Sequence, residues 1–244
     1  YHYGAFSYSE EGVWSEGAFV NATPMAGTPL SALAEGTLIK ILENGAPVEF
    51  YLAKHDYEPS LNGQGRELVV RKDCTNDNQM YTLYSSNIFS NSYILSYLDS
   101  TYVGLFSSYT QGLIATTAFY SASDPSENNS PVVSIRHKAF LLSATELDFD
   151  GNDVYGNWFT EGSPLTNGKF YWTVYMPDAG NYMWFTRSGR RNDNNEVWVV
   201  RSDGSDADTV TVSSYQYGYG CRPCFTLPST AMVDTSLNLI EESA

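Results

Sequence analysis

The pattern of apolar and polar positions first becomes regular at Gly36, where it predicts a β-hairpin. Residues 37–42 and 48–53 are rich in apolar, β-branched and aromatic side chains, the composition of strands. Asn44-Gly45 between them is typical of a two-residue hairpin turn, because both residues tolerate a positive φ. Residues 67–72 predict a third strand after a Gly-rich loop.

A helical spacing of apolar residues follows. In residues 92–106, Ile94, Leu95, Leu98, Tyr102 and Phe106 recur near a period of 3.6 residues, behind Ser90 and Asn91 as candidate caps. This stretch predicts a helix that packs on the sheet. The segment Ser143-Ala-Thr-Glu146 has the form of a capping box and predicts a second, short helix.

The second half of the chain is rich in loops, with short strand-like runs between them. The predicted strands there are 132–135, 139–142, 170–173, 181–186, 196–201, 209–213 and 221–227. Strands and one or two helices without a βαβ rhythm favour an α+β fold of short antiparallel strands. No internal repeat of 20 to 50 residues is visible.

Composition suggests one domain with flanking segments. Residues 1–35 are rich in Gly, Ala, Ser and Tyr and lack periodicity, so we expect an N-terminal arm or linker. Residues 36–230 form the predicted domain, and residues 231–244 a C-terminal tail. The length of 244 residues suffices for one sizeable core.

Charge narrows the choice of partners. The net charge of −15 repels phosphate backbones and anionic lipids, so we expect no nucleic acid partner. The cations Arg187, Arg190 and Arg191 cluster, but Asp193 and Glu196 dilute them. No apolar run is long enough to span a bilayer, so we expect no membrane insertion. The 19 tyrosines favour a protein that works outside the cytosol.

The C-terminal third carries a recognisable order of blocks: Ala139–Ser143, Tyr171-Trp172, a polar hairpin, and Gly220-Cys-Arg-Pro-Cys-Phe-Thr-Leu227. In this order the chain resembles, over residues 36–227, a bacterial and phage domain family of unknown function that ends in Gly-x-Arg-Pro-x-Phe-x-Leu. That family is similar to the formylglycine-generating-enzyme-like branch of the C-type lectin fold. The branch includes the variable proteins of diversity-generating retroelements, such as phage tropism determinants.

The resemblance implies a C-type lectin-like fold with a shallow ligand surface near the C-terminus. Tyr, Asn, Asp, Ser, Gln, Trp and Arg side chains fill the matching region, as in antibody paratopes. The candidate ligand-binding residues are Tyr175, Asn181, Tyr182, Trp184, Arg190, Asn192, Asp193, Asn194, Asn195, Ser213, Ser214, Tyr215, Gln216, Tyr217 and Tyr219. For any one of the tyrosines, packing across a hairpin is the alternative. Arg222 is assigned to structure, bonded to buried carbonyls or to an acid.

Enzymatic alternatives rest on weaker patterns. Cys221 and Cys224 have the C-x-x-C spacing of redox motifs, but a terminal strand lacks the helix N-terminus that activates such thiols. They leave open an oxidase of the formylglycine-generating type. Residues 148–153 alternate oxygen ligands, yet Gly151 is misplaced for an EF-hand, so a polar turn is preferred to calcium. Carboxylate pairs such as Asp148 and Asp150 leave open a surface hydrolase.

The sequence therefore predicts a non-enzymatic binding domain without cofactors. We expect it on a phage tail or a bacterial cell surface, where it would bind a protein or glycan of a host or neighbouring cell. Several copies on one particle would multiply weak contacts into avidity, and the N-terminal arm would attach or trimerise the domain. A purely structural virion or adhesin domain is the third alternative.

Overall fold

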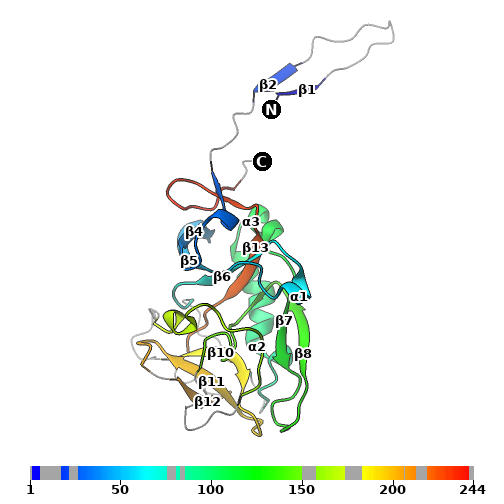
Figure 1. Cartoon of the computed structure of the whole chain (residues 1–244), viewed down its shortest axis with the longest axis vertical. Helices are drawn as coiled ribbons and strands as arrows, with labels where there is room; N and C mark the ends of the chain where they lie inside the picture. The colour runs from blue at the N-terminus through cyan, green and yellow to red at the C-terminus, as the bar shows by residue number, and fades with distance from the viewer. Residues whose placement is uncertain are drawn as a thin grey trace, which may run out of the picture.

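The computed structural model describes residues 2–5, 18–21, 27–75, 81–82, 86–149, 158–173, 183–205, 207–212 and 219–241. The main sheet is five-stranded and antiparallel, in the order β4-β5-β6-β13-β9 (Figure 1). Its strands are β4 (Leu38–Glu43), β5 (Ala46–Lys54), β6 (Arg66–Arg71), β13 (Cys224–Pro228) and β9 (Ala139–Phe140). Strand β13 comes from the end of the chain and lies between β6 and β9, so the sheet is completed only when the C-terminal residues are in place.

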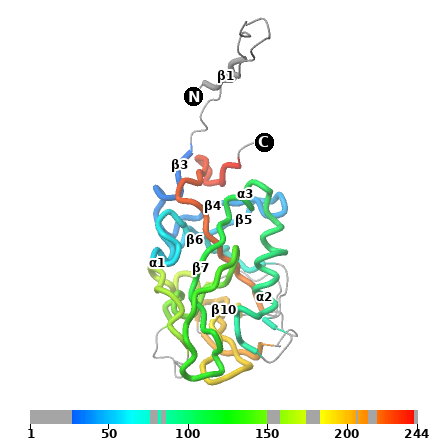
Figure 2. Tube along the Cα trace, turned by 90° about the vertical axis from the view of Figure 1, so that its right-hand side faces the viewer, coloured from blue at the N-terminus to red at the C-terminus, as the bar shows by residue number. Residues whose placement is uncertain are grey.

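The described residues also form smaller antiparallel sheets. A three-stranded sheet consists of β10 (Met183–Gly189), β11 (Glu196–Arg201) and β12 (Ala207–Thr211). Two-stranded pairs are formed by β7 (Thr117–Ala122) with β8 (Val132–His137), β3 (Thr28–Pro29) with β14 (Met232–Val233), and β1 (His2–Ala5) with β2 (Ala18–Asn21). Figure 2 shows β7 and β10 at the end of the molecule away from β3.

Helices are short and few. The α-helices are α1 (Pro59–Asn62), α2 (Tyr93–Ser96) and α3 (Ser108–Leu113). The 3-10 turns are Leu30–Ala32, Phe89–Asn91, Val103–Leu105 and Gly168–Tyr171, and Tyr97–Tyr102 is a π-helical stretch. Within the described ranges, no helix has the length and apolar character needed to cross a membrane. The α+β prediction is confirmed.

Two local predictions hold with changes of detail. The predicted helix 92–106 is a continuous helical segment from Tyr93 to Leu105 with a π-helical middle. Its cap is Ser92, whose Oγ accepts the Leu95 N–H at 3.2 Å, in place of the expected Ser90 or Asn91. The predicted hairpin turn is of type I′, because Asn44 and Gly45 have φ values of 52° and 76°.

Two other predictions are corrected. Residues 170–173 are not a strand, because Gly168–Tyr171 is a 3-10 helix. The backbone closes local turns instead: the Phe170 N–H donates to the Asn167 carbonyl at 2.8 Å, and the Trp172 N–H donates to the Lys169 carbonyl at 3.1 Å. Residues 144–148 form a hydrogen-bonded turn that does not continue as a helix. Its capping box nevertheless forms: Ser143 N–H donates to Glu146 Oε2 at 2.9 Å, and Glu146 N–H to Ser143 Oγ at 3.1 Å.

The folded unit extends beyond the predicted limits of 36–230. Leu30 and Val233 are fully buried in the common core, and the β3–β14 pair joins the two segments that contain them. Leu239 is also buried, and its N–H donates to the Lys40 carbonyl at 2.7 Å. Residues 27–35 and 231–241 are therefore part of the domain, because each supplies an apolar anchor to the sheet.

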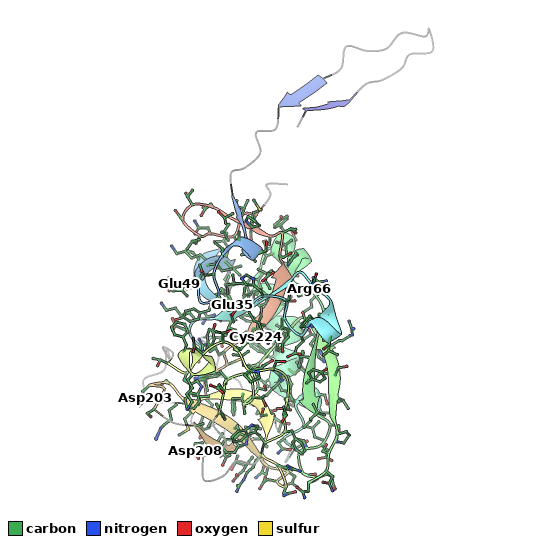
Figure 3. All side chains as sticks on the ribbon, in the orientation of Figure 1. Glu35, Glu49, Arg66, Asp203, Asp208 and Cys224 are labelled. Carbon is green, nitrogen blue, oxygen red and sulfur yellow. The ribbon has the colours of Figure 1, made fainter. Side chains whose placement is uncertain are left out.

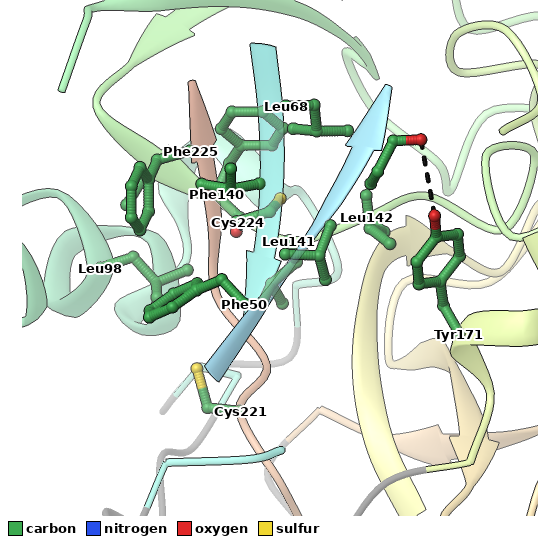
Figure 4. Packing of buried hydrophobic residues seen from close by; sticks show 14 of the residues in the cluster. Phe50, Leu68, Leu98, Phe140, Leu141, Leu142, Tyr171, Cys221, Cys224 and Phe225 are labelled. Atoms are coloured by element: carbon green, nitrogen blue, oxygen red, sulfur yellow. Dashed lines mark hydrogen bonds between the residues drawn. The ribbon is translucent and has the colours of Figure 1, made fainter. Parts of the chain in front are cut away.

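Aromatic side chains fill the core between the main sheet and the helical segment (Figure 4). Phe225 on β13 packs edge-on against Phe50 at 5.4 Å and Phe106 at 5.3 Å between ring centroids. Phe119 on β7 stacks on Phe140 at 4.3 Å. These contacts bind β7, β9 and β13 into one apolar layer.

A buried ion pair joins this layer to the three-stranded sheet. Arg187 on β10 is 1% exposed, and its Nη1 donates to Glu146 Oε2 at 2.6 Å. The same guanidinium donates to the carbonyls of Tyr120, Leu141 and Glu161 at 2.7 to 2.8 Å. The Tyr57 hydroxyl donates to the other oxygen of Glu146 at 2.5 Å. Arg187 therefore contacts segments from β7, β9 and the two loops around Glu146 and Glu161.

A second acid, Glu161, completes this network. The Glu161 carboxylate accepts the Ala122 N–H at 2.7 Å and the Ser188 hydroxyl. Burial raises the pKa of Glu161 from 4.5 to about 7, against the lowering effect of Arg187. Arg187 is thus shared between Glu146, which it neutralises, and Glu161, which binds a proton near neutral pH.

We expect the unfolding free energy to fall as pH rises. The pKa of Glu161 is raised in the folded state, so its contribution is full below pH 4.5 and is lost as pH rises through about 7. Between pH 4.5 and about 7 the unfolding free energy should fall by about 3 kcal/mol. Chemical denaturation from pH 4.5 to 8 measures it. Glu161→Gln imitates the protonated acid and should flatten the dependence of the unfolding free energy on pH. The control Glu127→Gln, at an exposed position, should keep the slope of the parent chain. Equal slopes for Glu161→Gln and the parent chain would refute the role of Glu161 in this pH dependence.

Candidate functional site

The turn between β10 and β11, residues 190–195, contains five of the predicted ligand-binding residues. It is held from below by one side chain, Asn87, which is 1% exposed. The Asn87 amide nitrogen lies 3.1, 2.8 and 2.9 Å from the carbonyl oxygens of Arg190, Asp193 and Glu196. A single buried amide thus fixes both ends and the middle of the turn.

Other contacts fix the turn from within. Asp193 Oδ1 accepts the N–H groups of Asn195 and Glu196 at 2.7 and 2.9 Å. Asn192 has a φ of 60°, a left-handed conformation that Asn tolerates better than most residues. Arg190 forms an ion pair with Glu196. The side chains of Asn192 and Asn194 remain exposed on this rigid backbone.

The loop between β7 and β8 lies against the turn. Asn192 N–H donates to the Pro125 carbonyl at 2.9 Å, and Arg191 Nε donates to the Asn128 carbonyl at 2.8 Å. A Cβ on Gly189 would lie 2.6 Å from the Pro125 ring, so only glycine permits this approach. Residues 123–124 and 127–131 line a hollow of about 430 Å³ beside the turn. Most residues of this loop are polar, but the position of the loop beside the turn depends on tertiary contacts.

The turn and the loop together form the distal surface, defined as residues 123–131 and 190–195. They lie at the end of the molecule opposite β3 and β14 (Figures 1 and 2). Val212, which precedes the predicted site residues from 213 onward, is bonded through its N–H to the Asn195 carbonyl at 2.8 Å. Val212, the described residue next to the predicted site residues 213–217, therefore lies beside the turn.

The remaining predicted site residues divide into two groups. Those outside the described residues are Tyr175, Asn181, Tyr182, Ser213, Ser214, Tyr215, Gln216 and Tyr217. Of the described ones, Trp184 is fully buried and donates from Nε1 to the Trp172 carbonyl at 3.1 Å, so it belongs to the core. Tyr219 is half-buried against Phe185, with ring centroids 5.3 Å apart.

The motif around Arg222 is structural. Arg222 is fully buried, its guanidinium lies 5.1 Å above the Trp184 ring, and its Nε donates to the Arg71 carbonyl at 2.7 Å. Nη1 donates to the Tyr171 carbonyl. Desolvation lowers the pKa of Arg222 to about 10. Arg222 therefore has a structural role as expected, and of the two expected kinds of partner, carbonyls or an acid, the hydrogen bonds go to carbonyls.

The three cysteines are buried thiols: Cys74, Cys221 and Cys224. Burial raises the pKa of Cys74 to about 12 and that of Cys224 well above its ordinary value. The Cys224 thiol donates to the Phe140 carbonyl at 3.2 Å. Figure 4 shows Cys221 and Cys224 in different parts of the packed interior. Protonated, buried thiols are poor nucleophiles.

Acidic side chains are the candidate ligands for a metal ion. In the parts of the chain that the structure describes, no three His, Cys, Asp or Glu side chains gather in a way that could hold a metal ion. The calcium alternative at 148–153 lies mostly outside the described residues, which include only Asp148 and Phe149 of that range. Asp203 and Asp208 lie at the edge of the three-stranded sheet (Figure 3), and Asp208 is exposed.

We expect Asn87→Ala to loosen the turn. The substitution removes the shared donor from three carbonyls and should cost about 1–3 kcal/mol of stability. Amide hydrogen exchange at residues 190–196 should accelerate, while exchange in the core strand β6 should follow only the global change. Asn129→Ala, in the exposed neighbouring loop, is the matched control. Unchanged exchange in the Asn87 variant would show that the turn is held by its own contacts.

Comparison with known proteins adds a family. No curated protein and no solved structure matches the chain. A family model described as "Domain of unknown function (DUF6273)" matches residues 64–229. The match begins before β6 and ends directly after β13, so it includes Arg187 with Glu146 and Glu161, the distal surface and the Arg222 motif. The chain therefore belongs to the DUF6273 family of domains of unknown function.

Proposed function

We propose that this chain is a non-enzymatic binding domain that recognises a protein or glycan on a host or neighbouring cell through the distal surface. The observation that carries the proposal is the rigid support of a polar turn. Asn87 and Asp193 hold the backbone of residues 190–195, while Asn192 and Asn194 stay exposed. A preorganised loop loses less entropy on binding and therefore binds more tightly.

A C-type lectin-like scaffold is part of the proposal. It is supported by the pairing of a strand near the start of the domain with one near its end, β3 with β14, and by the insertion of β13 into the main sheet. The binding turn is then carried on the separate three-stranded sheet. Loops on such a rigid support tolerate changes of sequence.

Display on a phage tail or bacterial surface fits the arrangement of the ends. β3 and β14 lie opposite the distal surface (Figure 1). Attachment at that end would leave the distal surface facing outward. Repeated copies would raise the apparent affinity of a shallow site.

Retroelement diversification is the finer form of the proposal. Asn192 and Asn194 are exposed, so substitutions there leave the core packing unchanged. Trp184 is buried, so its substitution would disturb that packing. DNA sequencing around the gene tests it. We expect a near-copy of the segment encoding residues 170–225, differing where the copy has adenine, beside a reverse transcriptase. Its absence would leave a binding domain with a fixed partner.

Binding itself is tested with the purified chain on intact bacterial cells and immobilised surface polysaccharides. The double variant Asn192→Gly and Asn194→Ala removes both exposed amides, and glycine keeps the positive φ at 192 without strain. We expect at least a tenfold loss of affinity, about 1.4 kcal/mol. Asp208→Ala on β12 is the matched control and should bind normally. Parent-like binding by the double variant and by Tyr215→Ala with Tyr217→Ala would place the contact elsewhere on the chain, and absence of binding by the parent chain would favour a structural domain instead.

A further inference from the structure

A second cavity lies at the other end of the β7–β8 pair. It has a volume of about 360 Å³ and lies between the helical segment 97–105, α3 and the end of β8. Its polar lining comes mainly from Asp99, Gln111, Thr116, Arg136, His137 and Lys138. Because Thr117 pairs with His137 and Ala122 with Val132, the whole length of the strand pair separates this cavity from the distal loop.

The single acid of the cavity is already engaged by the protein. Asp99 Oδ1 accepts the backbone N–H of Lys138 at 2.5 Å, and Asp99 Oδ2 lies 3.1 Å from His137 Nδ1. The Lys138 ammonium lies 3.4 Å from the Gln111 carbonyl, a neutral acceptor. The charge of Lys138 is therefore positioned by a carbonyl and is not cancelled by it.

This arrangement differs from that of other cations in the chain. Arg71, Lys72, Arg187 and Arg190 each have a carboxylate within 4 Å. Among the described residues, neither Arg136 nor Lys138 forms an ion pair, and Arg136 is exposed at the cavity. In a chain of net charge −15, the two cations Arg136 and Lys138 outnumber the single carboxylate of Asp99 at this cavity and leave a local excess of positive charge.

We propose that this cavity binds the oxyanion group of a small ligand, with Arg136 and Lys138 as the charged contacts. Arginine can grip a carboxylate, sulfate or phosphate through two parallel N–H donors, and lysine supplies a compact charge beside it. Gln111 and Thr116 supply polar groups for the rest of the ligand. The volume is at the lower end of the range for small-molecule sites. This site is separate from the distal surface and does not depend on the function proposed there.

The test is calorimetric titration of the purified chain with four probes at constant ionic strength: sodium sulfate, inorganic phosphate, glucuronate and uncharged glucose. We expect saturable binding of at least one anion, and none of glucose. Glucuronate alone would identify a carboxylate ligand, and sulfate or phosphate alone a tetrahedral ester. Absence of saturable binding by all three anions up to tens of millimolar would overturn the proposal.

Variants locate the binding. Arg136→Ala and Lys138→Ala should each weaken the anion at least tenfold, and the double variant should abolish saturation. Arg201→Ala removes an exposed cation from β11 and should leave the affinity unchanged. An equally large loss of anion affinity in Arg201→Ala would attribute the binding to the overall charge of the protein and refute the site. Parent-like affinity in the double variant would also refute it. Circular dichroism of each variant confirms folding before titration.

Discussion

Arg187 imposes the strictest constraint on this fold, because its buried guanidinium takes one ion pair and three carbonyl hydrogen bonds from separate parts of the chain. Removing such a cation from water costs several kcal/mol, which only good geometry and a paired acid offset. Glu146 supplies the charge, and three carbonyls from separate segments supply the remaining acceptors. Each of those segments must be in its final place for the pairing to be complete, so the network couples the sheets to one another.

The same network also determines the charges of the buried acids. One arginine faces two buried glutamates, Glu146 and Glu161, and burial raises the pKa of Glu161 to about 7 against the lowering effect of that arginine. The hydroxyls of Tyr57 and Ser188 complete the hydrogen bonds around the acids. The interior is thus polar at its centre and aromatic around it, with the Phe119 and Phe140 rings against the guanidinium.

The two candidate binding surfaces use this scaffold differently. At the distal surface the backbone is fixed from beneath by Asn87, and exposed amides would make the contacts of the proposed recognition. At the cavity near Arg136 the proposed recognition is electrostatic, because an acidic molecule keeps an excess of positive charge at one place. The β7–β8 pair carries a part of each surface at its opposite ends.

The sequence by itself determined the local structure: the Asn44-Gly45 turn, the strands around it, the helical segment and the strand Glu196–Arg201 all follow from spacing and turn chemistry. These features depend on neighbours a few residues away, which a linear pattern contains. The polar turn at 190–195 was also visible as a candidate site. Tertiary structure decided that Trp184 is a core residue, that Tyr171 and Trp172 share a helical turn, and that residues 27–35 and 231–241 join the domain. It alone brought Asn87 under the turn and Asp99 beside Lys138, because such contacts join residues far apart in the chain, whose meeting depends on how the sheets pack.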